Sequence, residues 1–119
     1  QALSTVIRGL EARCKLDETL IVLATEFGRT PRINQNAGRD HYPKAFSCLL
    51  AGGGIKGGIA YGKTDDRGET IIENRVTIQD FNATIAHAMG IDSSQIIHSP
   101  SGRPFKMANG GDHIADLFS

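Results

Sequence analysis

The amino-acid sequence predicts an α/β fold, on three observations. The apolar run from Leu20 to Ala24 is too short for a typical helix and indicates a strand that is buried on both faces. Helical patterns lie on either side of it in the chain, over residues 2–15 and 78–89. Polar residues follow the strand closely, beginning with Glu26, and the carboxyl ends of strands are where open α/β sheets bind ligands.

The first half of the chain is expected to form a helix, a strand, a long loop and a second strand. The helix at residues 2–15 is amphipathic. Its apolar side consists of Leu3, Val6, Ile7, Leu10 and Cys14. After a turn at residues 16–19 come the strand at 20–25 and a polar loop at 26–43. The mostly apolar segment 45–51 is the second strand, and it ends at a run of three glycines.

The second half is expected to contain a hairpin and a helix. Two half-exposed strands within residues 59–76 flank turn residues at 65–68, which predicts a β-hairpin. Thr77 and Asp80 resemble a capping box at the start of the second helix, and Gly90 supplies its C-terminal stop. The tail is looser, with an apolar pair, a turn and a last short helix at residues 96–97, 99–102 and 112–118.

The length and the charge of the chain limit the classes of function that it can have. The chain has 119 residues, so it is one domain or part of one. Thirteen basic and thirteen acidic residues cancel, which argues against a general nucleic-acid or membrane-surface role. Between Glu26 and Lys44, however, four cations accompany two acids. This local excess suits an anionic ligand, although a solvated loop would carry the same charges.

Cys14 and Cys48 are far apart and lack the spacing of a metal or redox site. Each lies in an apolar pattern, so we expect both to be small buried hydrophobic residues. The sequence has no signal peptide and no transmembrane run. Because it begins inside a helical pattern without a methionine, we interpret residues 1–119 as a fragment.

Two glycine motifs match nucleotide-binding patterns in letters but not in context. Residues 57–64 match GxxxxGK[ST], yet turn residues follow at 65–68, where a phosphate loop needs a helix. Residues 52–57 match GxGxxG but also lead into the hairpin. We interpret these glycines as a turn with positive φ after a strand. A nucleotide site would require a helix starting near Lys63.

The residues that could carry chemistry lie around the loop at 26–43. Glu26, Asp40 and His41 are oxygen and imidazole donors of the kind that bind zinc, manganese or calcium. Arg29 and Arg39 could fork onto two phosphate or sulfate oxygens. Each has a plainer alternative: Glu26 could cap a helix, His41 could be solvated, and the arginines could form salt bridges to Glu26 or Asp40.

Three stretches of the chain, in this order, resemble a known family. They are DETLIVLATEFGRTPRIN, GRDHYPKAFSCLLAGGGIKGG and VTIQDFNATIAHAMGI. They are similar to the C-terminal part of sulfatase-like proteins of the alkaline-phosphatase superfamily, and more closely to a bacterial sulfatase-like family of unassigned function. The resemblance covers nearly the whole chain, and the TEFGR and GRDH motifs are specific to that family.

The resemblance implies a partial three-layer αβα sandwich with the hairpin at its edge. It aligns Glu26 with a metal-binding Asp, and Phe27 with a neighbouring metal-binding His that Phe cannot replace. His41, with Asp40 beside it, is similar in placement to a later metal-binding His. One metal or an altered site is therefore expected instead of the standard two-metal site. The nucleophile and further metal carboxylates would lie in an N-terminal half.

We therefore expect the C-terminal segment of a metal-dependent hydrolase of sulfate or phosphate esters. Glu26, Asp40 and His41 would bind a divalent metal ion, and Arg29 and Arg39 an anionic small-molecule or sugar ester. The rival interpretation is a non-catalytic binding or scaffold protein that retains the fold.

The resemblance also suggests a periplasmic or exported location. A partial sheet leaves an open edge and an uncovered apolar face. We therefore expect self-association or pairing with the missing half, and no nucleic-acid or membrane partner.

Overall fold

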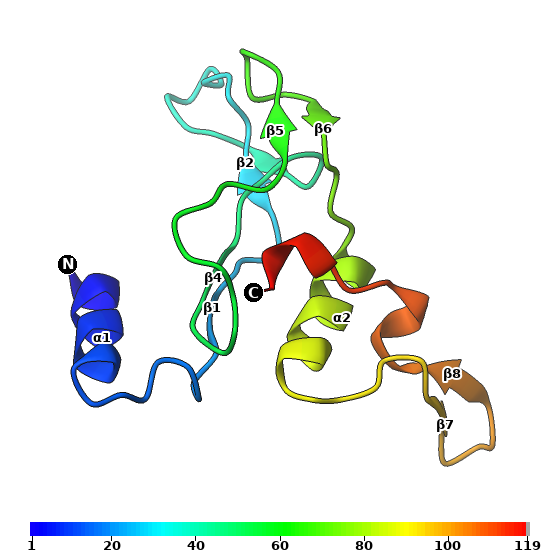
Figure 1. Ribbon diagram of the computed structural model, residues 1–119. Helices are drawn as coiled ribbons and strands as arrows, with labels where there is room; N and C mark the ends of the chain where they lie inside the picture. The colour runs from blue at the N-terminus through cyan, green and yellow to red at the C-terminus, as the bar shows by residue number, and fades with distance from the viewer. Residues whose placement is uncertain (119) are drawn as a thin grey trace. The chain divides into compact units, whose positions relative to one another are not determined.

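A computed structural model describes residues 1–118 and confirms a mixed α/β architecture (Figure 1). Within these residues there are two α-helices and four two-stranded sheets. The chain divides into two compact units. The first combines residues 1–20, 51–58 and the described residues from Val76 on, and the second combines residues 21–50 and 59–75.

The first unit holds the helices and one strand pair. Its elements are α1 (Ala2–Glu11), α2 (Ile78–Ala88), β7 (Ile96–His98), β8 (Pro104–Lys106) and the 3₁₀ segments η1 (Met107–Gly110) and η2 (Ala115–Leu117). The β7 and β8 strands pair antiparallel, with Ile97 opposite Phe105. The turn between them closes with the Gly102 N–H donating to the Ser99 carbonyl at 2.8 Å, as the sequence predicted.

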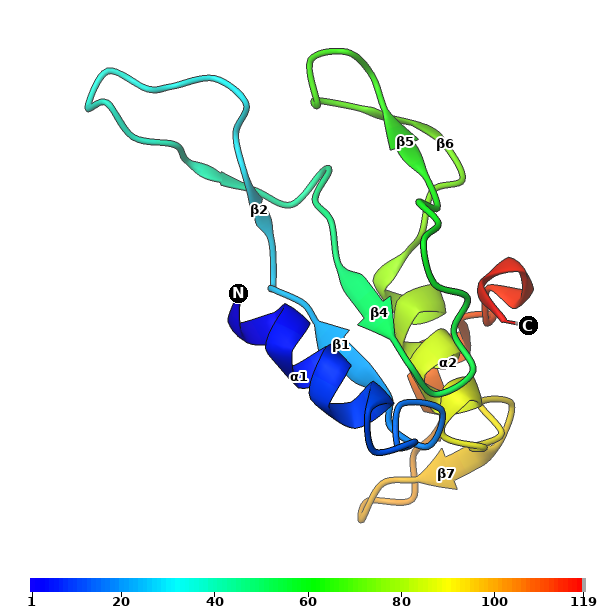
Figure 2. The same cartoon turned by 60° about the vertical axis from the view of Figure 1, so that its left-hand side comes forward.

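The other strands form three pairs. They are β1 (Ile21–Leu23) with β4 (Leu49–Ala51), β2 (Gly28–Arg29) with β3 (His41–Tyr42), and β5 (Lys63–Thr64) with β6 (Ile71–Glu73). Figure 2 shows β1 and β4 side by side. The predicted hairpin at 59–76 is confirmed as β5–β6, although its strands are shorter than expected. A nucleotide site at residues 57–64 would need a helix that starts near Lys63. Strand β5 occupies Lys63–Thr64 instead, so the nucleotide-site alternative is wrong.

Helix α2 begins and ends as the sequence predicted. The Asp80 N–H donates to Thr77 Oγ1 at 3.1 Å, and the Thr77 N–H donates back to Asp80 Oδ2 at 3.1 Å, which completes the capping box. At the other end, Gly90 has φ +71° and the Ile91 N–H donates to the Ala86 carbonyl at 2.8 Å. This is a Schellman motif, in which a left-handed residue satisfies the last helical carbonyls.

Helix α1 is shorter than expected for a similar reason. Cys14 adopts φ +53°, and the Lys15 N–H donates to the Leu10 carbonyl at 2.9 Å. The turn that ends the helix removes Cys14 from the apolar side, and Cys14 is exposed. Cys48 is exposed too, and it lies just before β4, which starts only at Leu49. The expectation that both cysteines are buried is therefore wrong.

The expectation of a strand buried on both faces is also wrong for the described chain. Val22 and Leu23 are 40% and 55% exposed. Successive strand residues point to opposite faces of a sheet, so β1 presents an apolar side chain on each face. Among the described residues, the buried side chains are few and small. They are Ala45, Ala83, Thr84 and Ala86.

Polar bonds join α2 to the C-terminal residues of the same unit. The Asp112 N–H donates to Asp80 Oδ1 at 3.1 Å, and the Ile114 N–H donates to Thr84 Oγ1 at 3.1 Å. A Cβ at Gly111 would lie 2.1 Å from the Gln79 backbone carbon, so only glycine permits this approach. The capping residue of α2 therefore also positions the last part of the chain.

The close approach of Gly52, in the turn after β4, to the backbone of residues 16 and 19 can be tested by substitution. Gly52 has φ +71°, and a Cβ there would lie 2.3 Å from the Thr19 carbonyl oxygen and 2.4 Å from that of Leu16. Gly54 has φ +81° but no atom within 4 Å of such a Cβ. Gly54→Ala should lower the free energy of unfolding by about 1 kcal/mol, the cost of a left-handed alanine. Gly52→Ala should cost clearly more in urea denaturation, and equal losses would contradict the close approach.

The Asp80 carboxylate predicts a pH dependence. Hydrogen bonds from the Thr77 hydroxyl and then from the Asp112 N–H lower the pKa of Asp80 below its ordinary 3.8. Its stabilising contribution is therefore present above pH 3.8 and is lost as the pH falls through the folded-state pKa. Asp80→Asn should lower the free energy of unfolding by about 1 kcal/mol at neutral pH. It should also reduce the fall of that free energy as the pH is lowered below 3.8, measured by urea denaturation. Asp66→Asn, at an exposed turn position, is the control and should keep the wild-type profile.

Candidate functional site

The segment 26–43, expected as a loop, is a hairpin with a paired base (Figure 2). Gly28 lies opposite Tyr42, and Arg29 lies opposite His41, in an antiparallel ladder. The Thr30 N–H continues it by donating to the Asp40 carbonyl at 2.9 Å. The two sequence motifs TEFGR and GRDH are therefore joined by their backbones.

Glycine in the first motif has a packing role. A Cβ at Gly28 would lie 2.7 Å from Phe46 Cβ and 3.1 Å from the Ala45 carbonyl oxygen. Any larger residue would push β2 away from the buried Ala45. The glycine thus lets the hairpin base approach the segment that leads to β4.

Asn34 organises the tip of the hairpin. Its Oδ1 accepts hydrogen bonds from the Asn36 and Gly38 N–H groups, each at 3.0 Å. Its Nδ2 donates to Asp40 Oδ1 at 2.9 Å. An Asn side chain that binds backbone amides in this way replaces missing ladder bonds. The tip is thereby tied to the second motif.

The register decides which side chains share a face. Opposite residues in a ladder point to the same side, and successive residues alternate. Arg29 and His41 therefore share a face with Phe27 and Arg39. The rings of Phe27 and His41 are stacked, with centroids 4.0 Å apart and planes at 29°. Asp40 belongs to the other face.

Backbone carbonyls hold the two arginines. Arg29 Nη1 donates to the Arg39 carbonyl at 3.3 Å, and Arg39 Nη1 donates to the carbonyls of Thr30, at 2.8 Å, and Pro31. The salt bridges within residues 1–118 are Lys15–Glu18 and Lys63–Glu73. The alternative of ion pairs from the arginines to Glu26 or Asp40 is thus not found in the described chain, and the two guanidinium groups have no carboxylate partner there.

The candidate metal ligands do not converge. Over residues 1–118, no three His, Cys, Asp or Glu side chains lie close enough together to hold a metal ion. Asp40 and His41 are neighbours in an extended chain and point to opposite sides. Asp40 already accepts the Asn34 amide, and His41 lies against Phe27. Glu26 is exposed, two residues before β2. The three residues predicted as metal ligands are therefore not brought together in the part of the chain that the structure describes.

The β5–β6 turn supports the hairpin from within the same unit. Tyr42 Oη donates to the Glu69 carbonyl at 2.7 Å, and Asp65 Oδ1 accepts the Glu69 N–H at 2.7 Å. The latter bond is the main cause of a lowered pKa at Asp65. Sequence reasoning missed Tyr42 because its partner is 27 residues away. It also missed Asn34, although an Asn four residues before Gly38 is a recognisable turn signal.

The fold and site define a mixed α/β chain with an exposed cationic hairpin. The chain belongs to the family described as "Protein of unknown function (DUF1501)", whose model matches residues 1–118. No curated protein and no solved structure matches it. In the part of the chain that the structure describes, neither helix has the length and apolar character needed to cross a membrane.

Asn34 provides a test of how the tip is held. Asn34→Ala removes two acceptor bonds, each contributing about 1 kcal/mol. The amide protons of Asn36 and Gly38 should then exchange with solvent about fivefold faster or more, measured by NMR hydrogen exchange. Gln35→Ala is the matched control, since Gln35 is exposed and its side chain makes no described hydrogen bond. Unchanged exchange in Asn34→Ala would contradict the role given to this side chain.

Proposed function

We propose that this chain is the C-terminal segment of a metal-dependent hydrolase of sulfate or phosphate esters. The observation that carries the proposal is the register of β2 and β3, which sets Arg29 opposite His41. By strand alternation, Arg39 lies on the same side. Two guanidinium groups beside an imidazole suit a tetrahedral oxyanion, because their N–H groups can donate to several of its oxygens at once.

The metal belongs to the same proposal. Glu26, Asp40 and His41 would be this chain's ligands to a zinc, manganese or calcium ion, and further residues outside it would complete the site. Because Asp40 and His41 point to opposite sides of the ladder here, binding one ion with both would require this part of the hairpin to rearrange when the site is completed. Such an ion polarises a sulfuryl or phosphoryl oxygen and activates a nucleophile. The nucleophile would also come from outside this chain. No catalytic step through the metal follows from the described residues alone.

The proposal extends to the larger fold. We infer that the chain is part of a three-layer αβα sandwich of the alkaline-phosphatase type, with β5–β6 at its edge. This would relate its family to the sulfatase-like proteins. The apolar side chains on both faces of β1, Val22 and Leu23, support the inference, because a central strand needs a layer on each side. In the absence of an N-terminal half, a second copy of the chain would cover them.

One observation favours a second candidate, a non-catalytic binding protein. Phe27 aligns with a metal-binding His in the resembled superfamily, and its ring here stacks on His41. An apolar ring at that place removes one ligand and covers one side of the imidazole. Such a protein would keep the anion-binding arginines without turning a substrate over.

The test uses the full-length gene product that contains this chain. We expect bound metal by elemental analysis and hydrolysis of 4-nitrophenyl sulfate or phosphate. Glu26→Ala and His41→Ala should lose both. Arg29→Gln should keep the metal but lower kcat/KM about tenfold or more, as expected for a lost charge-assisted bond. Arg75→Gln, an exposed arginine outside the hairpin, is the charge-matched control.

Two outcomes would redirect the proposal. A full-length protein that binds sulfate or phosphate through Arg29 but holds no metal and shows no turnover would support the binding protein. A protein that neither holds metal nor binds either anion would remove both candidates.

A further inference from the structure

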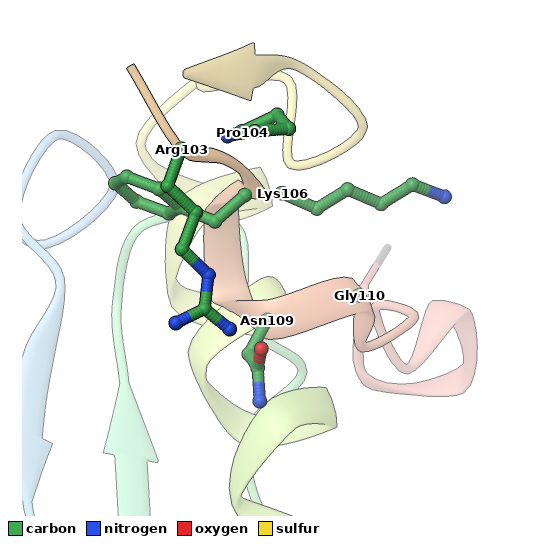
Figure 3. Close-up of a pocket in the computed structure, with 6 residues that line it drawn as sticks. Arg103, Pro104, Lys106, Asn109 and Gly110 are labelled. Atoms are coloured by element: carbon green, nitrogen blue, oxygen red, sulfur yellow. The ribbon is translucent and has the colours of Figure 1, made fainter. Parts of the chain in front are cut away.

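A second place in the described chain suits a ligand, and it lies apart from the hairpin in sequence. Arg103 and residues of β8 and η1, all of them exposed, line an open pocket of about 430 Å³ in the first unit (Figure 3). Its lining consists of Arg103, Pro104, Phe105, Lys106, Asn109 and Gly110. Pockets of roughly 300 to 1,000 Å³ are the usual size for small ligands.

The lining has a definite chemical character. It contains two cations, a carboxamide, an aromatic ring and a proline, and no carboxylate. Within residues 1–118, neither Arg103 nor Lys106 takes part in a salt bridge. The Phe105 side chain is 45% exposed. Unpaired cations beside an accessible aromatic ring suit a ligand with both an anionic group and an apolar body.

The side chains are arranged to separate these functions. Figure 3 shows the Arg103 guanidinium turned toward the side chain of Asn109, whereas Lys106 extends past Gly110. Arg103 and Lys106 are three residues apart on an extended segment, so they leave it on opposite sides. An oxyanion between Arg103 and Asn109 would therefore receive N–H donors from both.

The backbone under the pocket is held in an uncommon conformation. Ala108 and Asn109 have φ values of +55° and +53°, and Gly110 follows at +80°. A left-handed alanine costs about 1–2 kcal/mol. Such conformations persist where neighbours impose them, and they collect at ligand sites.

Both flanks of this bend are anchored. The Met107 N–H donates to the Gln95 carbonyl at 3.1 Å, and Gly111 packs against the backbone of Gln79 in α2. The anchors fix the backbone that carries Asn109 before any ligand arrives. A site that is already formed avoids the entropic cost of ordering it on binding.

We propose that this pocket binds a small organic oxyanion, in which a sulfate, phosphate or carboxylate group is attached to an aromatic or similarly flat apolar body. Arg103 and Asn109 donate to the oxyanion, and Pro104 and Phe105 contact the body. Lys106 adds positive potential at the rim. The site is independent of the hydrolase proposal, since it uses none of the hairpin residues.

The test is calorimetric titration of the protein that contains this chain with phenylphosphonate, whose carbon–phosphorus bond resists ester hydrolysis. The titrations use the Arg29→Gln background, so that the hairpin does not contribute. One site is expected. Arg103→Gln should weaken binding about tenfold or more, equivalent to about 1.4 kcal/mol. Phe105→Ala should weaken it about three- to tenfold, and Arg75→Gln should have no effect.

Arg103→Gln should not disturb the fold, because the turn is held by main-chain groups. The Arg103 N–H donates to Ser99 Oγ at 3.1 Å, and the Arg103 carbonyl accepts the Ser99 N–H at 3.0 Å. Unchanged affinity in Arg103→Gln would overturn the proposal. Two results together would overturn the recognition of an apolar body. They are equal affinities for inorganic phosphate and phenylphosphonate, and an unchanged affinity for phenylphosphonate in Phe105→Ala.

Discussion

Polar side chains that satisfy backbone amides hold each unit of this protein together. The buried set in the described chain is three alanines and a threonine, and small side chains remove little apolar area from water. Turns, caps and side-chain bonds to the main chain therefore add to the packing of half-buried apolar side chains in the described chain. Asp80 is the clearest case, because one carboxylate caps α2 and also binds the Asp112 N–H.

Hydrogen bonds between polar side chains and the main chain also position the candidate site. Asn34 binds the tip of the hairpin, and Tyr42 bonds to the β5–β6 turn that Asp65 stabilises. These bonds flank the β2–β3 ladder that carries Arg29 and His41. The ladder places Arg29 and His41 on one face and separates Asp40 from His41. The residues proposed to bind an anion therefore lie together on this segment, whereas the proposed metal ligands are not brought together in the described chain.

The two proposed sites share a physical basis. In each, an arginine lacks a carboxylate partner among the described residues and lies beside an aromatic ring or a proline. They differ in what fixes the geometry. Strand pairing sets the hairpin face, while a left-handed bend between two anchors sets the pocket at β8 and η1.

The sequence alone determined the features that depend on neighbouring residues. Both ends of α2 and the β5–β6 hairpin follow from local capping and turn patterns. Only the tertiary structure decided the strand register, the exposure of Val22 and Cys14, and the pairing of Tyr42 with Glu69. Register and exposure depend on partners distant in sequence, and a shift of one residue moves every side chain to the other face. Local patterns therefore identified the candidate site residues, but only chain pairing showed which of them share a face.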